Sequence, residues 1–165
     1  MNPSKRDIDS IYKLLIRVYE QHGFDGILID PFKNIEPESN KRDDQHLHEV
    51  FARFKEMSVE TNTVMNWIAH PKSNVNRIVN GDLVPCNQYM LAGGSAWDNS
   101  MDGIYSIQRP NRLEDVSSPD VTFHNLKQKL QELVSQCGKV EGIEFDIKTR
   151  RYSFWGRDPL GDLPH

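Results

Sequence analysis

Apolar residues recur at helical spacing in two stretches of the first half of the chain. One stretch predicts a helix over residues 6–21, and Gly23 follows where a C-terminal cap falls. The other predicts a helix that Asp43 or Asp44 can cap. Its apolar positions are Leu47, Val50, Phe51, Phe54 and Met57. Both stretches are expected to be amphipathic helices that pack against a core.

Two short apolar runs flank the second predicted helix. Residues 24–30 and 63–69 are continuous rather than alternating in hydrophobicity, as strands buried on both faces are. A strand, a helix and a second strand in this order predict two parallel neighbouring strands. Pro31 has no backbone N–H, so strand pairing is expected to stop directly after Asp30.

The second half of the chain has a different pattern. Residues 71–89 are polar, rich in asparagine and without periodicity, which predicts a long loop. The Gly-Gly-Ser at residues 93–95 predicts a break in secondary structure. Four short antiparallel strands are then expected at residues 104–108, 121–127, 140–147 and 151–155. Residues 129–135 have a short helix as an alternative, because leucines lie there at helical spacing.

These elements predict an α/β protein in which parallel strands with helices are followed by C-terminal antiparallel strands. The 165 residues are 37% hydrophobic and 27% charged, a composition typical of one globular domain, expected over residues 1–165. A net charge of -4 gives no global attraction to nucleic acid. Contact with a polyanion must therefore come from a local cluster of basic residues.

Cysteine usage and hydropathy indicate the compartment. Cys86 and Cys137 lack the spacing of metal ligands, so we expect free thiols in a reducing compartment, with no disulfide and no metal bound to them. No segment approaches the roughly 20 apolar residues that span a bilayer, and the amino terminus lacks the apolar core of a signal peptide. We expect a cytoplasmic protein without membrane contact.

Asp30 and His70 stand at the carboxyl ends of the two predicted parallel strands. Open α/β sheets bind ligands at this edge. Asp30 supplies the hard oxygen that Mg²⁺ prefers, although an aspartate after a strand is also a common turn former. His70 can donate to a phosphate or be an ordinary hydrogen-bonded histidine at the rim. The pair points to nucleotide chemistry more specifically than either residue alone.

Three segments in this order resemble the RecA-type motor domain of hexameric replicative DNA helicases. They are Ile-Asp-Pro-Phe at residues 29–32, Ile-Ala-His-Pro-Lys at residues 68–72, and Gly-Ser-Ala-Trp-Asp-Asn-Ser-Met-Asp-Gly-Ile at residues 94–104. The branch it most resembles is the Twinkle-like and phage primase-helicase type, related to the DnaB type, over about residues 24–154. The resemblance implies part of a RecA-like sheet of the P-loop NTPase superfamily, in an ATP-driven motor that moves on single-stranded DNA.

The resemblance assigns roles to individual residues. Asp30 takes the Walker B position, where it helps to hold Mg²⁺ with ATP, and His70 takes the position that senses the γ-phosphate. Lys72 begins the loop that contacts single-stranded DNA, and Arg77 is a further candidate in that loop. Positive side chains in such loops track the backbone phosphates.

Lys127 and Lys129 resemble a lysine-x-arginine pair that reaches across the subunit interface to the neighbour's nucleotide. Lysine stands where the pattern has arginine, and its ammonium lacks the planar fork that stabilises transition-state charge. A solvated basic pair at a strand end is the alternative interpretation. The resemblance also implies a homo-oligomer, a hexameric ring in the parent family.

The sequence contains no G-x-x-x-x-G-K-S/T motif. It therefore resembles the C-terminal portion of such a motor without the Walker A segment, and on its own it is not expected to bind ATP or Mg²⁺ tightly. An incomplete sheet leaves an edge or an apolar face uncovered, which favours self-association. Two alternatives remain: a non-catalytic nucleic-acid-binding or regulatory module, and an unrelated α/β enzyme with Asp30 and His70 as an acid–base pair. Trp97 is expected to pack in the core.

Overall fold

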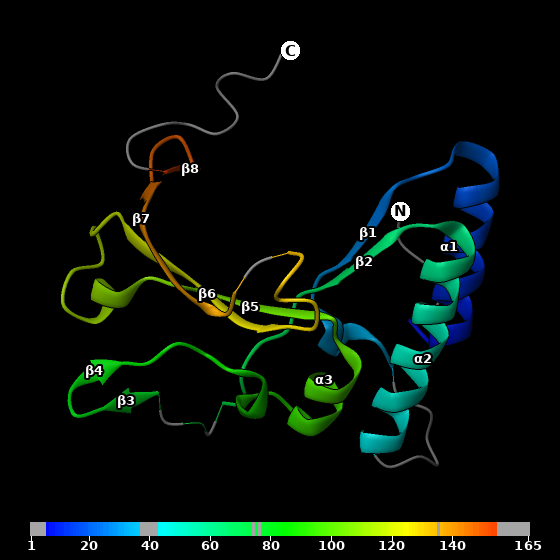
Figure 1. The fold of residues 1–165 in the computed structure, drawn as a ribbon, viewed down its shortest axis with the longest axis horizontal. Coiled ribbons are helices and arrows are strands. Elements are labelled where there is room, and N and C mark those ends of the chain that lie inside the picture. The colour runs from blue at the N-terminus through cyan, green and yellow to red at the C-terminus, as the bar shows by residue number, and fades with distance from the viewer. Residues whose placement is uncertain (1–5, 37–42, 74, 76, 135, 155–165) are drawn as a thin grey trace. The chain divides into compact units, whose positions relative to one another are not determined.

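The computed structural model describes residues 6–36, 43–73, 75, 77–134 and 136–154 (Figure 1). The chain divides into two compact units. The first unit is built from Met1–Lys72 and Leu91–Ser100, and the second from Ser73–Met90 and Met101–His165. The expectation that residues 1–165 act as one domain stays a prediction.

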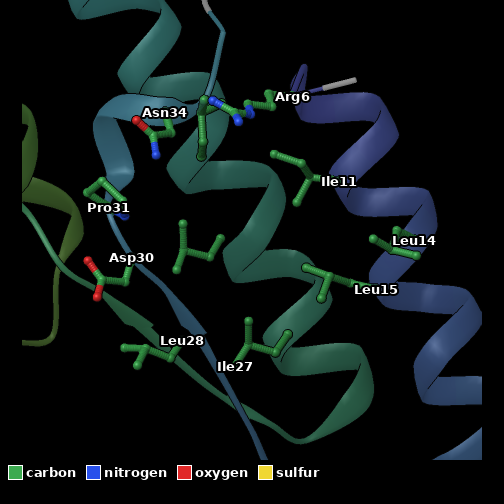
Figure 2. A pocket seen from close by; sticks show the side chains of 11 residues that line it. Arg6, Ile11, Leu14, Leu15, Ile27, Leu28, Asp30, Pro31 and Asn34 are labelled. Carbon is green, nitrogen blue, oxygen red and sulfur yellow. The ribbon is translucent and has the colours of Figure 1, made fainter. Parts of the chain in front are cut away.

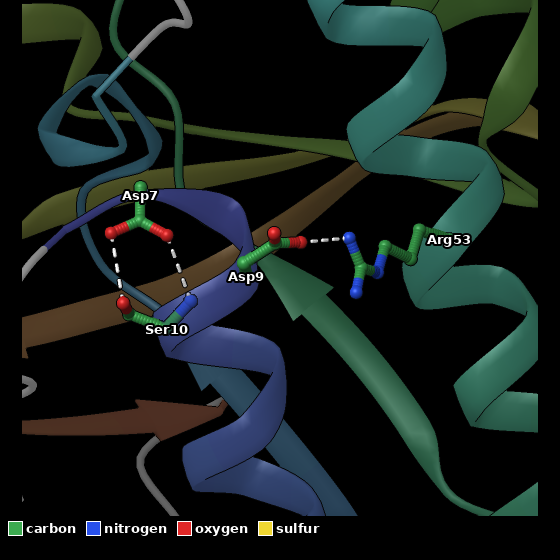
Figure 3. A network of polar contacts seen from close by, with 4 residues as sticks. All are labelled: Asp7, Asp9, Ser10 and Arg53. Atoms are coloured by element: carbon green, nitrogen blue, oxygen red, sulfur yellow. Dashed lines mark hydrogen bonds and ion pairs between the residues drawn. The ribbon is translucent and has the colours of Figure 1, made fainter.

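Helix α1, Ile8–His22, begins and ends where its capping residues lie. The Asp7 carboxylate accepts hydrogen bonds from the Ser10 backbone N–H at 2.9 Å and the Ser10 hydroxyl at 2.8 Å (Figure 3). Gly23 has φ of 66°, which favours glycine, and its N–H donates to the Tyr19 carbonyl at 2.8 Å. The predicted helix and its glycine cap are confirmed.

The predicted strand–helix–strand order is also confirmed. Strand β1, Gly26–Ile29, pairs in parallel with β2, Val64–Trp67, and helix α2, Asp43–Thr61, connects them. Both strands are shorter than expected. Beyond β1, the chain enters the short 3-10 helix η1, Phe32–Asn34. The side chains of Asp43 and Asp44 lie outside the described set, so the cap of α2 stays a prediction.

Helix α2 supplies the centre of the core in the first unit. Val50, Phe54 and Met57 are fully buried, and Phe51 is nearly so. An ion pair between Arg53 of α2 and Asp9 of α1 joins the two helices at their exposed side (Figure 3). The Arg53 guanidinium also lies 4.6 Å from the centre of the Tyr12 ring, in a cation–π contact. The amphipathic patterns therefore identified the buried face of α2 correctly.

The expected break at residues 93–95 is wrong, because helix α3, Gly94–Ser100, begins there. Only Gly93 has the conformation of a breaker, with φ of 70°. Its carbonyl accepts from the Ala96 N–H at 2.8 Å and so starts the helix. Helix α3 buries Trp97, which is 5% exposed, so the expectation of a core tryptophan is confirmed.

The expected long loop over residues 71–89 is wrong in part. It contains a small antiparallel hairpin of β3, Ile78–Val79, and β4, Asp82–Leu83, followed by the 3-10 helix η2, Gln88–Met90. Asn80 and Gly81 form its turn, with φ of 53° and 91°. Asn-Gly is the residue pair that two-residue hairpin turns prefer, so the sequence did contain the signal.

The second unit is built on a four-stranded sheet in the order β5-β6-β7-β8. The strands are β5, Gly103–Gln108, β6, Asp120–Gln128, β7, Gly138–Asp146, and β8, Arg151–Phe154. The 3-10 helix η3, Pro110–Leu113, lies between β5 and β6. Every pair in the sheet is antiparallel, which confirms the prediction. Residues 129–133 form turns, so the alternative of a helix there is wrong.

Among the described residues, no helix is long and apolar enough to cross a membrane.

Replacing Gly93 by alanine tests the junction between α2 and α3. A Cβ at Gly93 would overlap the Leu47 side chain, and an L-residue is strained at this positive φ. We expect Gly93→Ala to lower the free energy of unfolding by about 1–3 kcal/mol, measured by urea denaturation. Gly138→Ala is the matched control, because no atom lies within 4 Å of its Cβ position, and we expect a change within about 0.5 kcal/mol. Equal effects of the two substitutions would contradict the packing described for Gly93.

Candidate functional site

Asp30 and His70 lie at the same edge of the sheet in the first unit. Asp30 directly follows β1, and His70 comes three residues after the last residue of β2. Because the strands are parallel and Ile29 pairs with Trp67, both strands end at this edge. Both side chains are exposed. The edge is therefore open to a ligand, and it does not provide the desolvated pocket that a general acid–base pair needs.

Aromatic packing fixes the backbone next to Asp30. The Phe32 ring lies 5.0 Å from the Trp97 ring, 5.6 Å from the Trp67 ring and 5.7 Å from the Phe51 ring, centre to centre. The Phe32 N–H also donates to the Ile68 carbonyl at 2.9 Å. Asp30 is thus an exposed carboxylate on a rigid support.

A single carboxylate is the metal-binding capacity of this edge. Among the described residues, no group of three His, Cys, Asp or Glu side chains is placed to hold a metal ion. Mg²⁺ is usually held by one or two carboxylates, several waters and the phosphates of a nucleotide. Asp30 fits that donor set as one ligand, while the other ligands would have to come from a bound nucleotide, water or other protein groups.

A groove beside Asp30 was not predicted from the sequence. Its volume is about 280 Å³, and it lies between α1, β1 and η1 (Figure 2). Arg6 and Asn34 lie near one another at one end of it, and Ile11, Leu14 and Leu15 line its α1 side. No sequence motif contains Arg6 and Asn34, and only the fold brings them near Asp30.

The two candidate DNA-binding residues have different environments. Lys72 is exposed and follows the sheet edge that carries His70. Arg77 belongs to the second unit, where its Nε and Nη2 groups donate to the Val84 carbonyl at 3.2 and 3.0 Å. Val84 in turn donates its N–H to the Arg77 carbonyl at 2.8 Å. Arg77 thus braces the hairpin that contains β3 and β4.

Arg77 also acts on a neighbouring thiol. Burial raises the pKa of the Cys86 thiol above its ordinary value, and the Arg77 guanidinium offsets part of that rise. Cys86 is half-buried, whereas Cys137 is exposed, and both are free thiols. The positive charge of Arg77 is thus partly directed at its own unit.

Lys127 and Lys129 lie at the end of β6, beside the start of β5. Lys127 pairs with Ile104 across the two strands. The Lys129 ammonium forms an ion pair with the Asp102 carboxylate at 2.7 Å, and the Lys129 backbone N–H donates to the Asp102 carbonyl at 2.9 Å. Both side chains of the ion pair are more than a third exposed, so the pair contributes only about 0.2–1 kcal/mol. Lys129 is therefore held within its own unit by a weak tie that a stronger anion can replace.

The environment of Arg77 can be tested through Cys86 in a Cys137→Ser background. Removing the positive charge disfavours the thiolate, so the pKa of Cys86 rises further and less thiolate is present at a fixed pH. We expect Arg77→Met to slow alkylation of Cys86 by iodoacetamide at pH 8 by about two- to five-fold. Arg77→Lys keeps the charge and should retain most of the rate. Faster alkylation of the methionine variant would mean that Arg77 does not act on Cys86 in this way.

Comparison with known proteins places the fold. No family model matches the sequence, and no curated protein matches it. A structure of the ATPase domain of a DnaB-like replicative helicase matches with a TM-score of 0.71 and 15% identity, over 88% of this chain and 50% of that one. A structure of a DnaB-like replicative helicase and its interactions with primase matches with a TM-score of 0.66 and 13% identity, over 89% of this chain and 35% of that one.

The chain spans half of the first matched structure and about a third of the second. At such low identity the likeness establishes the fold. The RecA-like α/β architecture inferred from the three sequence segments is confirmed, and this chain has the fold of the ATPase domains of DnaB-like replicative helicases.

Proposed function

We propose that this chain is the metal-binding and phosphate-sensing portion of a DnaB-type motor that uses ATP to move along single-stranded DNA. The observation that carries the proposal is the position of Asp30 and His70 at one edge of two parallel strands, in a chain whose fold matches a helicase ATPase domain at a TM-score of 0.71. This edge is where α/β sheets bind nucleotides.

In this proposal Asp30 is the Walker B carboxylate and contributes one oxygen ligand to Mg²⁺. When bound, the ion would neutralise charge on the transferred phosphoryl group. His70 follows the neighbouring strand and would donate to the γ-phosphate. The Walker A loop would come from another polypeptide segment, because the 165 residues contain no such motif.

Lys72 is the first candidate for contact with DNA, because its side chain is exposed next to the sheet edge. Arg77 remains a candidate, but its hydrogen bonds to Val84 support a role in shaping the loop. Lys127 and Lys129 would act on the nucleotide of a neighbouring copy in a homo-oligomeric ring. Lys129 would have to exchange Asp102 for a phosphate to do so.

A second candidate function is a non-catalytic module that binds nucleic acid or regulates a motor. Two observations favour it: a lysine stands at the position of the arginine in the resembled pair, and that lysine is engaged by Asp102. The two candidates differ in whether ATP changes DNA binding once a Walker A segment is present.

DNA binding is tested by fluorescence anisotropy of a labelled oligothymidylate over a salt series. We expect binding at low salt that weakens as the salt concentration rises. Lys72→Ala should weaken it on any sequence and flatten the plot of log affinity against log salt by about 0.7, the value for one lost phosphate contact on a single strand. Lys13→Ala, an exposed lysine of α1, is the control and should leave the slope unchanged. Absence of binding at low salt would refute both candidate functions.

Nucleotide binding is tested by calorimetric titration of the 165-residue chain with Mg-ATP. We expect no tight binding, because the backbone cradle and the lysine that hold the phosphates are absent from the sequence. Micromolar affinity would contradict the proposal that this chain supplies only one portion of the nucleotide site.

A further inference from the structure

The connector between β6 and β7 exposes three bulky apolar side chains within five residues. Leu130 is 59% exposed, Leu133 80% and Val134 62%. Single exposed apolar residues are common on soluble proteins, but a contiguous group is typical of an interaction surface. We use the name connector for the described residues between the two strands, 129–134 and 136–137.

The connector is held in place by its own hydrogen bonds. The N–H groups of Leu133 and Val134 donate to the Leu130 carbonyl at 3.1 and 3.0 Å. The Gln131 side chain accepts from the Cys137 N–H at 3.3 Å, and the Asn125 side chain donates to the Gln136 carbonyl at 3.0 Å. The ion pair of Lys129 with Asp102 fixes its start. A surface that is ordered before binding loses less conformational entropy when a partner covers it.

The groove of the first unit is complementary to the connector in chemistry. Leucine and isoleucine side chains of α1 and β1 line it, and Leu28 is 62% exposed there (Figure 2). Its volume of about 280 Å³ admits aliphatic side chains of the size of leucine.

The charged residues at the two surfaces are also complementary. Arg6 and Asp30 line the groove, and the connector carries Glu132 between its two exposed leucines and Lys129 at its start. Insertion of the leucines can therefore pair Glu132 with Arg6, and in the same orientation Lys129 with Asp30. Opposite charges at the edge of an apolar contact mainly set its orientation.

We propose that the connector of one copy of this chain docks into the groove between α1 and β1 of a second copy. Each copy has one connector and one groove, so the contact is head-to-tail and can close into a ring. This deepens the proposed homo-oligomeric motor, but the contact itself needs neither ATP nor DNA. Three side chains cover much less than the roughly 1,200 Å² of a stable interface, so association should be weak and concentration-dependent.

The test measures weight-average mass by light scattering or sedimentation over a concentration series, without nucleotide. We expect the wild-type mass to rise above the 19.1 kDa of one chain as concentration increases. Leu133→Asp and Leu28→Asp should each restore the monomer mass. Val116→Asp and Val64→Asp are matched controls at positions 70% and 63% exposed, outside the connector and the groove, and should associate as wild type does. All four sites are exposed, and an unchanged urea midpoint confirms that each variant is folded.

Mixing the two monomeric variants distinguishes a head-to-tail contact from a symmetric one. Leu133→Asp retains an intact groove and Leu28→Asp an intact connector, so an equimolar mixture should form dimers and stop there. A wild-type chain that stays monomeric would overturn the proposal, as would a Leu28→Asp variant that still associates alone. An equimolar mixture without dimers would also overturn it. None of these outcomes depends on ATP or DNA binding, so the proposed motor function can fail separately.

Discussion

The candidate site depends on the packing of five aromatic rings in the first unit. Phe51 lies 4.7 Å from Trp97 and 5.7 Å from Trp67, ring centre to ring centre, and Phe54 lies 5.3 Å from Trp67. Phe32 completes the cluster. Because these rings come from η1, α2, β2 and α3, the cluster fixes the end of β1 against that of β2. Asp30 can be exposed and still well positioned, since the aromatic neighbour two residues later bears the packing energy.

The second unit solves a different problem, because its sheet is held mainly by backbone pairing and local polar contacts. Arg77 closes the β3–β4 hairpin, and Asp102 fixes the start of the connector through Lys129. Both basic residues, which the resemblance associates with phosphate groups, are thus engaged by their own unit. For an exposed ion pair this engagement is weak, so it is compatible with exchange for a phosphate.

Much of the fold could be predicted from local patterns. Helical spacing identified α1 and α2, continuous apolar runs identified β1 and β2, and short apolar runs separated by turns identified β5 to β8. The failures lay where glycine was read only as a breaker. Gly93 does interrupt the chain, but its carbonyl starts α3, and Asn80-Gly81 turns a hairpin in a segment predicted to be loop. In both cases a glycine with positive φ joins two elements.

The sequence by itself determined which residues can form helices and strands, and that Asp30 and His70 follow two parallel strands, because periodicity and chain order are local properties. It also determined that no Walker A loop is present within the 165 residues. Only the tertiary structure decided that Lys129 meets Asp102, 27 residues away, that Arg77 turns to Val84, and that Arg6 and Asn34 lie beside Asp30. These contacts depend on side-chain directions and packing between distant segments, on which residue type and spacing carry no information.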